Sequence, residues 1–188
     1  MENQETVVTP EEQQQRLIDQ GLYTSEAVTV LSSPEELYNF WLDPTNFMTF
    51  TEQLEAVHQI SETKSHWVWR ALKGGKTIEW VSEIVEQKPY LLIAWRSTPE
   101  SDLRLSGRVE FVPLNYHRGT VVRVKMAYDL PTGKLLNLIE KTLGESPHRN
   151  LKINLIKLRE LFEAGEIPKV EGQPAGNKRE HETKTALH

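Results

Sequence analysis

The sequence of 188 residues contains no cysteine. This absence excludes disulfide bonds, thiolate nucleophiles and cysteine-ligated metals, including the Rieske cluster of ring hydroxylases. An excess of basic charge is also missing, because 22 Lys and Arg residues stand against 27 Asp and Glu residues, for a net charge of −5. An acidic chain of this kind argues against nucleic acid as a general partner.

Long apolar segments are missing as well. No apolar run approaches the roughly 18–20 residues that span a bilayer. The first residues, MENQETVVTPEEQQQ, have neither the basic start nor the apolar stretch of a signal peptide. We therefore expect a cytoplasmic protein without a transmembrane segment, and the sequence leaves transient membrane contact and the oligomeric state open.

Motifs for catalysis and metal binding are also absent from the sequence. It has no Ser/His/Asp order, no paired-carboxylate motif and no nucleophile elbow. The histidines form no i, i+4 pair on a helix and no HExxH motif; they are His58, His66, His117, His148, His181 and His188. We therefore predict no metal site, no cofactor and no dedicated catalytic residue.

What the sequence does contain is a compact middle between two polar ends. We expect residues 1–23 to form a polar N-terminal extension, 24–168 to form one folded domain, and 169–188 to be a disordered tail. Within the domain, Thr77–Ser97 is the most informative stretch. It indicates a long alternating strand, a turn that contains proline and a second strand, with Ile78, Trp80, Ser82 and Ile84 on one face of the first.

The same patterns predict the order of the other elements. Ser33 followed by Pro34 and two glutamates is typical of a capped helix start, and Asp43-Pro44 should end that helix. The expected strands are Glu26–Leu31, Leu54–Ser61, Ser65–Leu72, Lys76–Glu86, Leu91–Ser97, Arg104–Val112 and Thr120–Asp129. A second short helix is expected over Pro44–Phe50. Pro131-Thr132-Gly133 should end the sheet, and the remainder to Ala164 should be helical, with a break at Gly144–Pro147. Two short helices thus separate the first two strands. The predicted class is α+β, a curved seven-stranded antiparallel sheet wrapped around a long C-terminal helix.

Three segments of this sequence resemble a known family. They are SSPEELYNFWLDPTNFMTFTEQLEAV, KTIEWVSEIVEQKPYLLIAWRS and FEAGEIP. They are similar to the polyketide cyclase/dehydrase branch of the START-like (SRPBCC) superfamily, which also contains coenzyme-Q-binding proteins. The resemblance covers Thr24–Pro168. It implies the helix-grip fold, with a deep cavity between the concave sheet and the C-terminal helix and with the two short helices closing one end.

The alternation of the strands says which side chains would line such a cavity. The candidate ligand-binding residues on the strands are Trp67, Trp69, Ile78, Trp80, Ser82, Ile93, Trp95, Ser97, Val109, Phe111, Val122, Val124, Met126 and Tyr128. Those on the helices are Leu135, Ile139 and Leu143, with Phe47 and Phe50 as a lid. A mostly apolar wall with a few hydroxyls suits an aromatic, polyprenyl or acyl ligand. The alternative is that these residues simply fill the core, as large apolar side chains usually do.

Two functions of different class follow. The first is the binding or transport of a hydrophobic small molecule, such as a quinone, a lipid or a polyketide-like compound. The alternative is a polyketide cyclase or dehydratase, which needs inward-facing acid and base groups. Because His66, Arg70 and Arg96 alternate away from the tryptophan-bearing faces, we expect them in solvent, and this favours the carrier. A weaker third possibility is an interaction module whose polar ends recruit partners.

Overall fold

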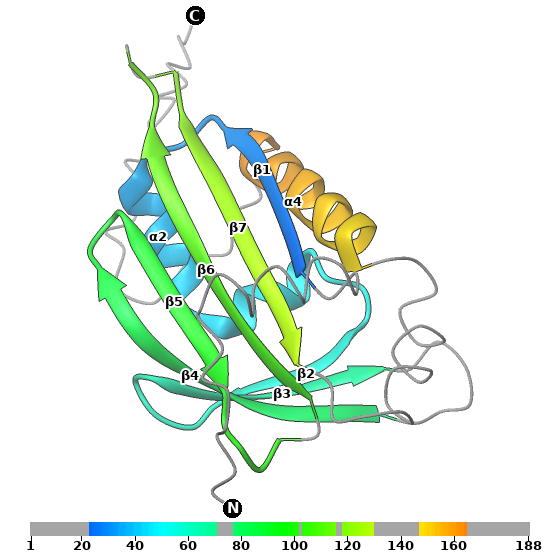
Figure 1. The fold of residues 1–188 in the computed structure, drawn as a ribbon. Coiled ribbons are helices and arrows are strands. Elements are labelled where there is room, and N and C mark those ends of the chain that lie inside the picture. Colours follow the sequence, from blue (N-terminus) through cyan, green and yellow to red (C-terminus); the bar gives the residue numbers. More distant parts are fainter. Residues whose placement is uncertain (1–22, 71–76, 102, 116–117, 130–146, 165–188) are drawn as a thin grey trace, which may run out of the picture.

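A single antiparallel sheet of seven strands organises the protein (Figure 1). The computed structural model describes residues 23–70, 77–101, 103–115, 118–129 and 147–164. The elements in chain order are β1 (Tyr23–Val30), α2 (Pro34–Leu42), the 3₁₀ helix η1 (Pro44–Thr49), β2 (Leu54–Gln59), β3 (Lys64–Arg70), β4 (Thr77–Lys88), β5 (Leu92–Ser97), β6 (Arg104–Pro113), β7 (Thr120–Asp129) and α4 (Pro147–Glu163). The predicted α+β class and the helix-grip arrangement are confirmed.

The sheet is built from consecutive hairpins and one long connection. Strands β2 to β7 neighbour one another in sequence order, and β1 pairs with β7 at the far edge, so the order is β1-β7-β6-β5-β4-β3-β2. Helices α2 and η1 lie in the connection from β1 to β2, where two short helices were predicted. Strand β1 begins at Tyr23, three residues before the predicted start, because Tyr23, Thr24 and Ser25 extend its ladder with β7.

Two β-bulges bend the sheet. One interrupts β2 between Leu54 and Ala56, and the other interrupts β4 between Ile84 and Glu86. A bulge places two residues opposite one and increases the local bend of the strand. In Figure 1, β2 and β3 accordingly run across the lower ends of β5, β6 and β7. The concave side that results carries α2, while α4 lies alongside β1.

Helix α2 starts and stops where its sequence directs. The Ser33 hydroxyl accepts a hydrogen bond from the Glu36 backbone N–H at 3.2 Å, and the Glu36 carboxylate accepts one from the Ser33 N–H at 3.0 Å. This reciprocal capping box satisfies two donors at the helix start. At the other end the Asp43 carboxylate accepts from the Thr45 N–H at 2.9 Å and so starts η1. The backbone therefore turns sharply between the two helices.

The main core lies between the sheet, α2 and the C-terminal half of α4. Its buried residues are Val30, Leu37, Tyr38, Phe40, Trp41, Phe50, Ile93, Val109, Phe111, Val122, Val124, Leu155, Leu158 and Phe162. Phe40 of α2 meets Phe162 of α4 edge-on with ring centroids 5.0 Å apart, which joins the two helices over the sheet. A smaller second cluster contains Ile78, Trp80, Leu103 and Leu105.

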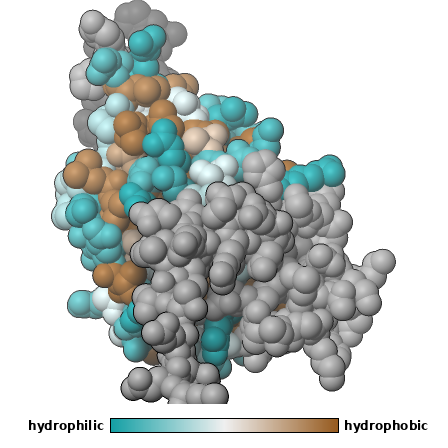
Figure 2. All heavy atoms as spheres, viewed as in Figure 1, coloured by the Kyte–Doolittle hydropathy of each residue, from teal (hydrophilic) through white to brown (hydrophobic). Residues whose placement is uncertain are grey.

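The described part of the outer surface in Figure 2 mixes hydrophilic and hydrophobic residues. Glu110 on β6 lies within 4.0 Å of Arg123 and Lys125 of the neighbouring strand β7, and it also pairs with Arg108 of its own strand. Burial raises the pKa of Glu110, but the nearby positive charges of Arg108, Lys125 and Arg123 outweigh that effect and hold the pKa below its ordinary value. This face is therefore a network of ion pairs, and the apolar residues of the strands gather on the opposite face.

Candidate ligand-binding cavity

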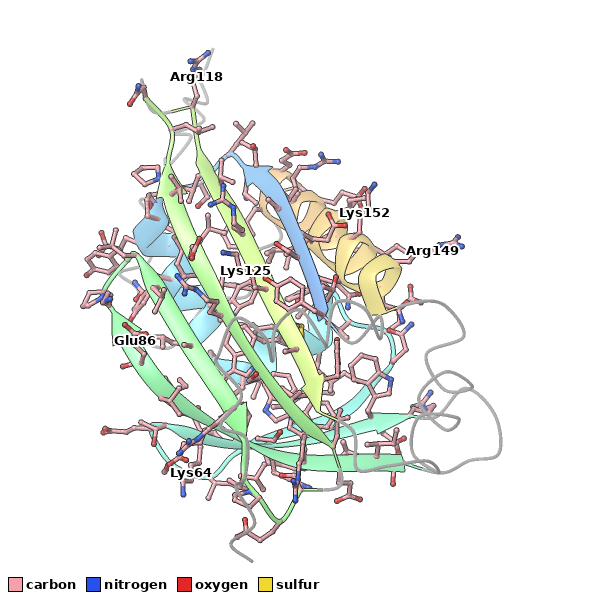
Figure 3. The ribbon with its side chains drawn as sticks, viewed as in Figure 1. Lys64, Glu86, Arg118, Lys125, Arg149 and Lys152 are labelled. Carbon is pink, nitrogen blue, oxygen red and sulfur yellow. The ribbon has the colours of Figure 1, made fainter. Side chains whose placement is uncertain are left out.

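A cavity of about 170 Å³ lies on the concave side of the sheet. The strands β3 to β7 supply one side of it, α2 and η1 a second, and the first turns of α4 a third. In Figure 3, Arg149 and Lys152 of α4 point away from the sheet. The residues of α4 that line the cavity are Asn150, Leu151, Asn154 and Leu155, so this helix presents its charged face to solvent and another face to the cavity.

Tryptophan dominates the wall. The sequence has five tryptophans, and all of them line the cavity: Trp41, Trp67, Trp69, Trp80 and Trp95. The indoles of Trp67 and Trp80 stack with centroids 5.8 Å apart and planes 10° from parallel, and Trp69 lies 6.1 Å from Trp80. Register explains this cluster, because Trp67 and Trp80 are directly opposite each other on β3 and β4. Cross-strand aromatic pairs of this kind stabilise the curled end of a sheet.

Phe47 of η1 connects the helices to this aromatic wall. Its ring meets Trp67 edge-on at 5.2 Å and Trp41 edge-on at 5.0 Å. Trp41 in turn lies 6.4 Å from Trp95 and 6.0 Å from Phe111 of the main core. Phe47 and Trp41 therefore form the junction between the cavity and the core.

A glycine on β6 sets the position of Trp95. Gly107 is opposite Trp95 in the β5–β6 ladder. A Cβ atom at position 107 would lie 2.6 Å from Cζ2 of Trp95, closer than two carbon atoms approach. The indole therefore rests against the backbone of β6, and any side chain at position 107 would displace it. Glycine is required at position 107 because the Trp95 ring approaches the β6 backbone closely.

Hydroxyl groups form a row across the same face. Ser65 on β3 is opposite Ser82 on β4, and Ser82 is opposite Ser97 on β5. Ser97 bonds both to the N–H of Leu105 at 2.6 Å and to its carbonyl at 3.0 Å, and Leu105 is opposite Tyr128 on β7. The Ser65 hydroxyl accepts a hydrogen bond from Trp67 Nε1 at 2.8 Å. The Ser82 hydroxyl, which lies on the cavity wall, has no protein partner among the described residues.

Ionisable groups are scarce on the described part of the wall. They are Glu62, Lys64 and Tyr128. Glu62 is exposed, and Lys64 lies 3.5 Å from Glu83 of the neighbouring strand. Burial raises the pKa of the Tyr128 phenol, so this group stays neutral at physiological pH. The described residues also contain no group of three or more His, Asp or Glu side chains placed to hold a metal ion.

Most of the predicted wall residues face the cavity. They are Phe47, Phe50, Trp67, Trp69, Trp80, Ser82, Ile93, Trp95, Val124, Met126 and Tyr128. Their position is thus as predicted, and their contact with a ligand stays a prediction. Leu135, Ile139 and Leu143 lie outside the described residues.

Five other predicted wall residues are placed elsewhere. Val109, Phe111 and Val122 are fully or almost fully buried in the main core, and Ile78 belongs to the second cluster. Ser97 is occupied by its two hydrogen bonds to Leu105. The reason is geometric: alternation identifies the inward face of a strand, and it does not say which part of that face a helix covers.

The wall also contains residues that were not predicted as ligand-binding. Trp41 faces the cavity as well as the core, and Thr51, Leu54, Asn150 and Asn154 are further residues of the wall. Asn150 and Asn154 are one helical turn apart, next to Leu151 and Leu155 of the predicted apolar stripe. A polar pair inside an otherwise apolar helix face is the sequence feature that could have identified these two asparagines as cavity residues.

The basic residues expected in solvent are on the outer face. His66 Nε2 lies 3.0 Å from a Glu79 carboxylate oxygen, and Arg70 Nε lies 3.4 Å from Glu55. Arg96 is exposed. None of the three lines the cavity.

Comparison with known proteins agrees with this architecture. The profile of the family described as "Polyketide cyclase / dehydrase and lipid transport" matches residues 32–156. The fold is similar to that of a crystal structure from Deinococcus radiodurans, with 28% identity over 76% of this chain and 98% of that one and a TM-score of 0.61.

Two further structures show the same fold. One is from Thermus thermophilus, with 23% identity over 76% of this chain and 98% of that one and a TM-score of 0.62. The other is a START superfamily protein from Mycobacterium smegmatis, with 14% identity over 76% of this chain and 97% of that one and a TM-score of 0.59. No curated protein matches the chain. Helices that could span a membrane are absent from the part of the chain that is described.

The family match covers two thirds of the sequence and includes both helices α2 and η1 and the whole of β2 to β7. It supports hydrophobic ligand binding in general, in agreement with an apolar cavity lined by five tryptophans. The chain belongs to the polyketide cyclase/dehydrase and lipid transport family and has its START-like, helix-grip fold.

Proposed function

We propose that this protein binds a hydrophobic small molecule in the cavity and carries or senses it without chemical change. The observation that supports the proposal most directly is the composition of the wall. Five indoles surround a space that contains few ionisable groups, and the most enclosed of them, Tyr128, stays protonated. An apolar wall with a few placed polar groups is typical of binding sites for small hydrophobic molecules.

The carrier is favoured because general acid–base catalysis needs a group that can exchange a proton near neutral pH. Burial moves the pKa of Tyr128 further from neutrality. Glu62 is exposed, and Lys64 is close to Glu83, so neither is placed like a buried catalytic acid or base. Quinones, lipids and polyketide-like compounds are the ligand classes that the wall admits.

Native mass spectrometry of the purified full-length protein, followed by solvent extraction, tests this proposal. We expect a hydrophobic molecule bound in a 1:1 ratio and absent from the matched variant Trp80→Ala. A protein that is empty as purified and that takes up no hydrophobic compound offered to it would contradict the proposal.

A cyclase or dehydratase is the second candidate, and one feature favours it. The Tyr128 hydroxyl is on the wall, and its partner among the described residues is the weakly accepting Sδ of Met126 at 3.8 Å. A neutral phenol so weakly held could donate a hydrogen bond or a proton to a polyketide carbonyl. Turnover of a polyketide-like substrate by the wild type, lost in Tyr128→Phe with binding retained, would establish the enzyme.

A further inference from the structure

The unpaired polar groups of the cavity wall are mostly hydrogen-bond donors. Of the five indole N–H groups, only that of Trp67 has a protein acceptor within the described part of the chain. Trp69 Nε1 is fully buried and has no hydrogen-bond partner among the residues that the structure describes. An indole N–H can donate but cannot accept, and a buried donor without an acceptor is unfavourable. The Ser82 hydroxyl adds a further donor beside them.

The wall also has a definite shape. The rings of Trp67 and Trp80 are nearly parallel, and the ring of Trp95 packs closely against β6 because position 107 is glycine. Flat aromatic surfaces pack best against other flat rings, in offset or edge-on contact, and pack less completely against a flexible saturated chain. The shape therefore favours a planar ligand.

The charges on the wall favour a neutral ligand. Lys64 is the one cation on the described wall, it comes from the β2–β3 end, and it lies 3.5 Å from Glu83. An ionised carboxylate that left water for this cavity would find no free cation on the described wall to compensate its charge. Such an uncompensated burial is strongly unfavourable. A fatty-acid anion is thus poorly matched to the wall.

From these three features we infer that the cavity selects a neutral, planar, conjugated molecule that carries carbonyl-type acceptor oxygens, over hydrocarbons of the same shape and over acyl lipids. The inference rests on the proposed function and narrows it. Acceptor oxygens on the ligand would bond to indole N–H groups and to the Ser82 hydroxyl, and its ring would pack against the indoles.

A matched set of probes tests the inference. Isothermal titration calorimetry would compare 1,4-naphthoquinone with naphthalene, which has the same ring frame without acceptors, and with decanoate as an acyl anion. The absence of cysteine prevents thiol adducts of the quinone. Since a net hydrogen bond changes affinity by about two- to tenfold, two such bonds predict naphthoquinone to bind roughly tenfold or more tightly than naphthalene. Decanoate should bind weakest.

Two measurements test whether the Ser82 hydroxyl and the indole N–H groups cause the preference for naphthoquinone over naphthalene. Ser82→Ala should weaken naphthoquinone binding about fivefold and leave naphthalene binding unchanged. The control Ser106→Ala removes an exposed hydroxyl from the outer face of β6 and should change neither. In ¹H–¹⁵N NMR spectra, at least one tryptophan indole N–H should shift downfield with naphthoquinone and not with naphthalene.

The outcomes separate the two proposals. Equal binding of naphthalene and naphthoquinone, or tighter binding of decanoate, would overturn the inference and leave hydrophobic binding intact. A preference for naphthoquinone with no indole shift and no effect of Ser82→Ala would also overturn it, because the donors would then play no part. Failure of all three probes to bind would count against the proposed function itself.

Discussion

The two ends of the concave face differ in what covers them. At one end, Val109 and Val122 are fully buried, under residues such as Leu37 and Phe40 of α2 and Leu158 of α4. At the other end, the same strands β6 and β7 carry Gly107, Met126 and Tyr128, which border the cavity or hold its wall in place. The strand pattern is the same at both ends. The covering helices therefore decide which end is core and which is cavity.

Helix α4 shows the same change along its own length. Leu155, Leu158 and Phe162 are buried in the main core. One and two turns before Leu158, Asn154 and Asn150 border the cavity, together with Leu151 and Leu155. An amide is too polar to fill an apolar core without several partners, so these residues favour an open space. The polar turn of α4 marks where close packing ends.

The largest expected effect comes from the filled end. Phe111→Ala should lower the free energy of unfolding by about 3–5 kcal/mol, because it removes an almost fully buried ring and leaves a void. Urea denaturation measures this loss. Ligand affinity of the folded fraction should change little, because Phe111 does not border the cavity. A loss below about 1 kcal/mol would mean that this end is loosely packed.

Truncation at the cavity end should affect both stability and binding. We expect Trp80→Ala and Trp95→Ala each to lower the free energy of unfolding by about 1–3 kcal/mol, less than complete burial would give, because both indoles border open space. Each should also weaken binding of the ligand by at least tenfold. Denaturation and titration of the same samples measure the two effects. Variants that unfold more easily and bind normally would show that these indoles are only core.

Position 107 tests how the cavity wall is held in place. Gly107→Ala places a Cβ 2.6 Å from the Trp95 ring, so the indole must move, and we expect a loss of about 1–3 kcal/mol from overpacking. A displaced indole also narrows the cavity and should weaken binding. Trp95→Phe added to Gly107→Ala should restore part of the stability, because the smaller ring avoids the clash. Strict additivity of the two substitutions would contradict this contact.

The sequence predicted the fold more completely than the site. Alternation along Thr77–Ser97 placed Trp80, Ser82 and Trp95 on the correct face, because the period of a strand is local. The same rule could not separate Val109 and Phe111 from Met126 and Tyr128. That separation depends on which strand positions α2 and α4 cover, and those contacts join residues far apart in sequence. Helix periodicity identified Leu151 and Leu155, but their asparagine neighbours gain meaning only beside the cavity.

The smallest expected effect concerns the cap of α2, the helix that covers the filled end. Glu36 accepts hydrogen bonds from the Ser32 hydroxyl at 2.6 Å, from the Ser33 N–H at 3.0 Å and from the Ser33 hydroxyl at 2.9 Å. The bond from Ser32 and those from Ser33 hold the pKa of Glu36 below its ordinary value of 4.5. A carboxylate whose pKa is lowered by folding stabilises the protein above its unfolded pKa, and that contribution disappears as the pH falls through the folded value.

Glu36→Gln should therefore cost less than about 1 kcal/mol at pH 7, because the group is largely exposed and solvent screens its charge. The difference from the wild type should shrink toward zero as the pH falls below the lowered pKa of Glu36. Thermal unfolding at several pH values measures this. Glu35→Gln removes the same charge from the same helical turn outside the capping box, so the excess effect at position 36 isolates the hydrogen bonds. An equal effect of both substitutions at every pH would show that the box adds nothing beyond the interaction of the charge with the helix dipole, and the filled end would then depend on apolar packing alone.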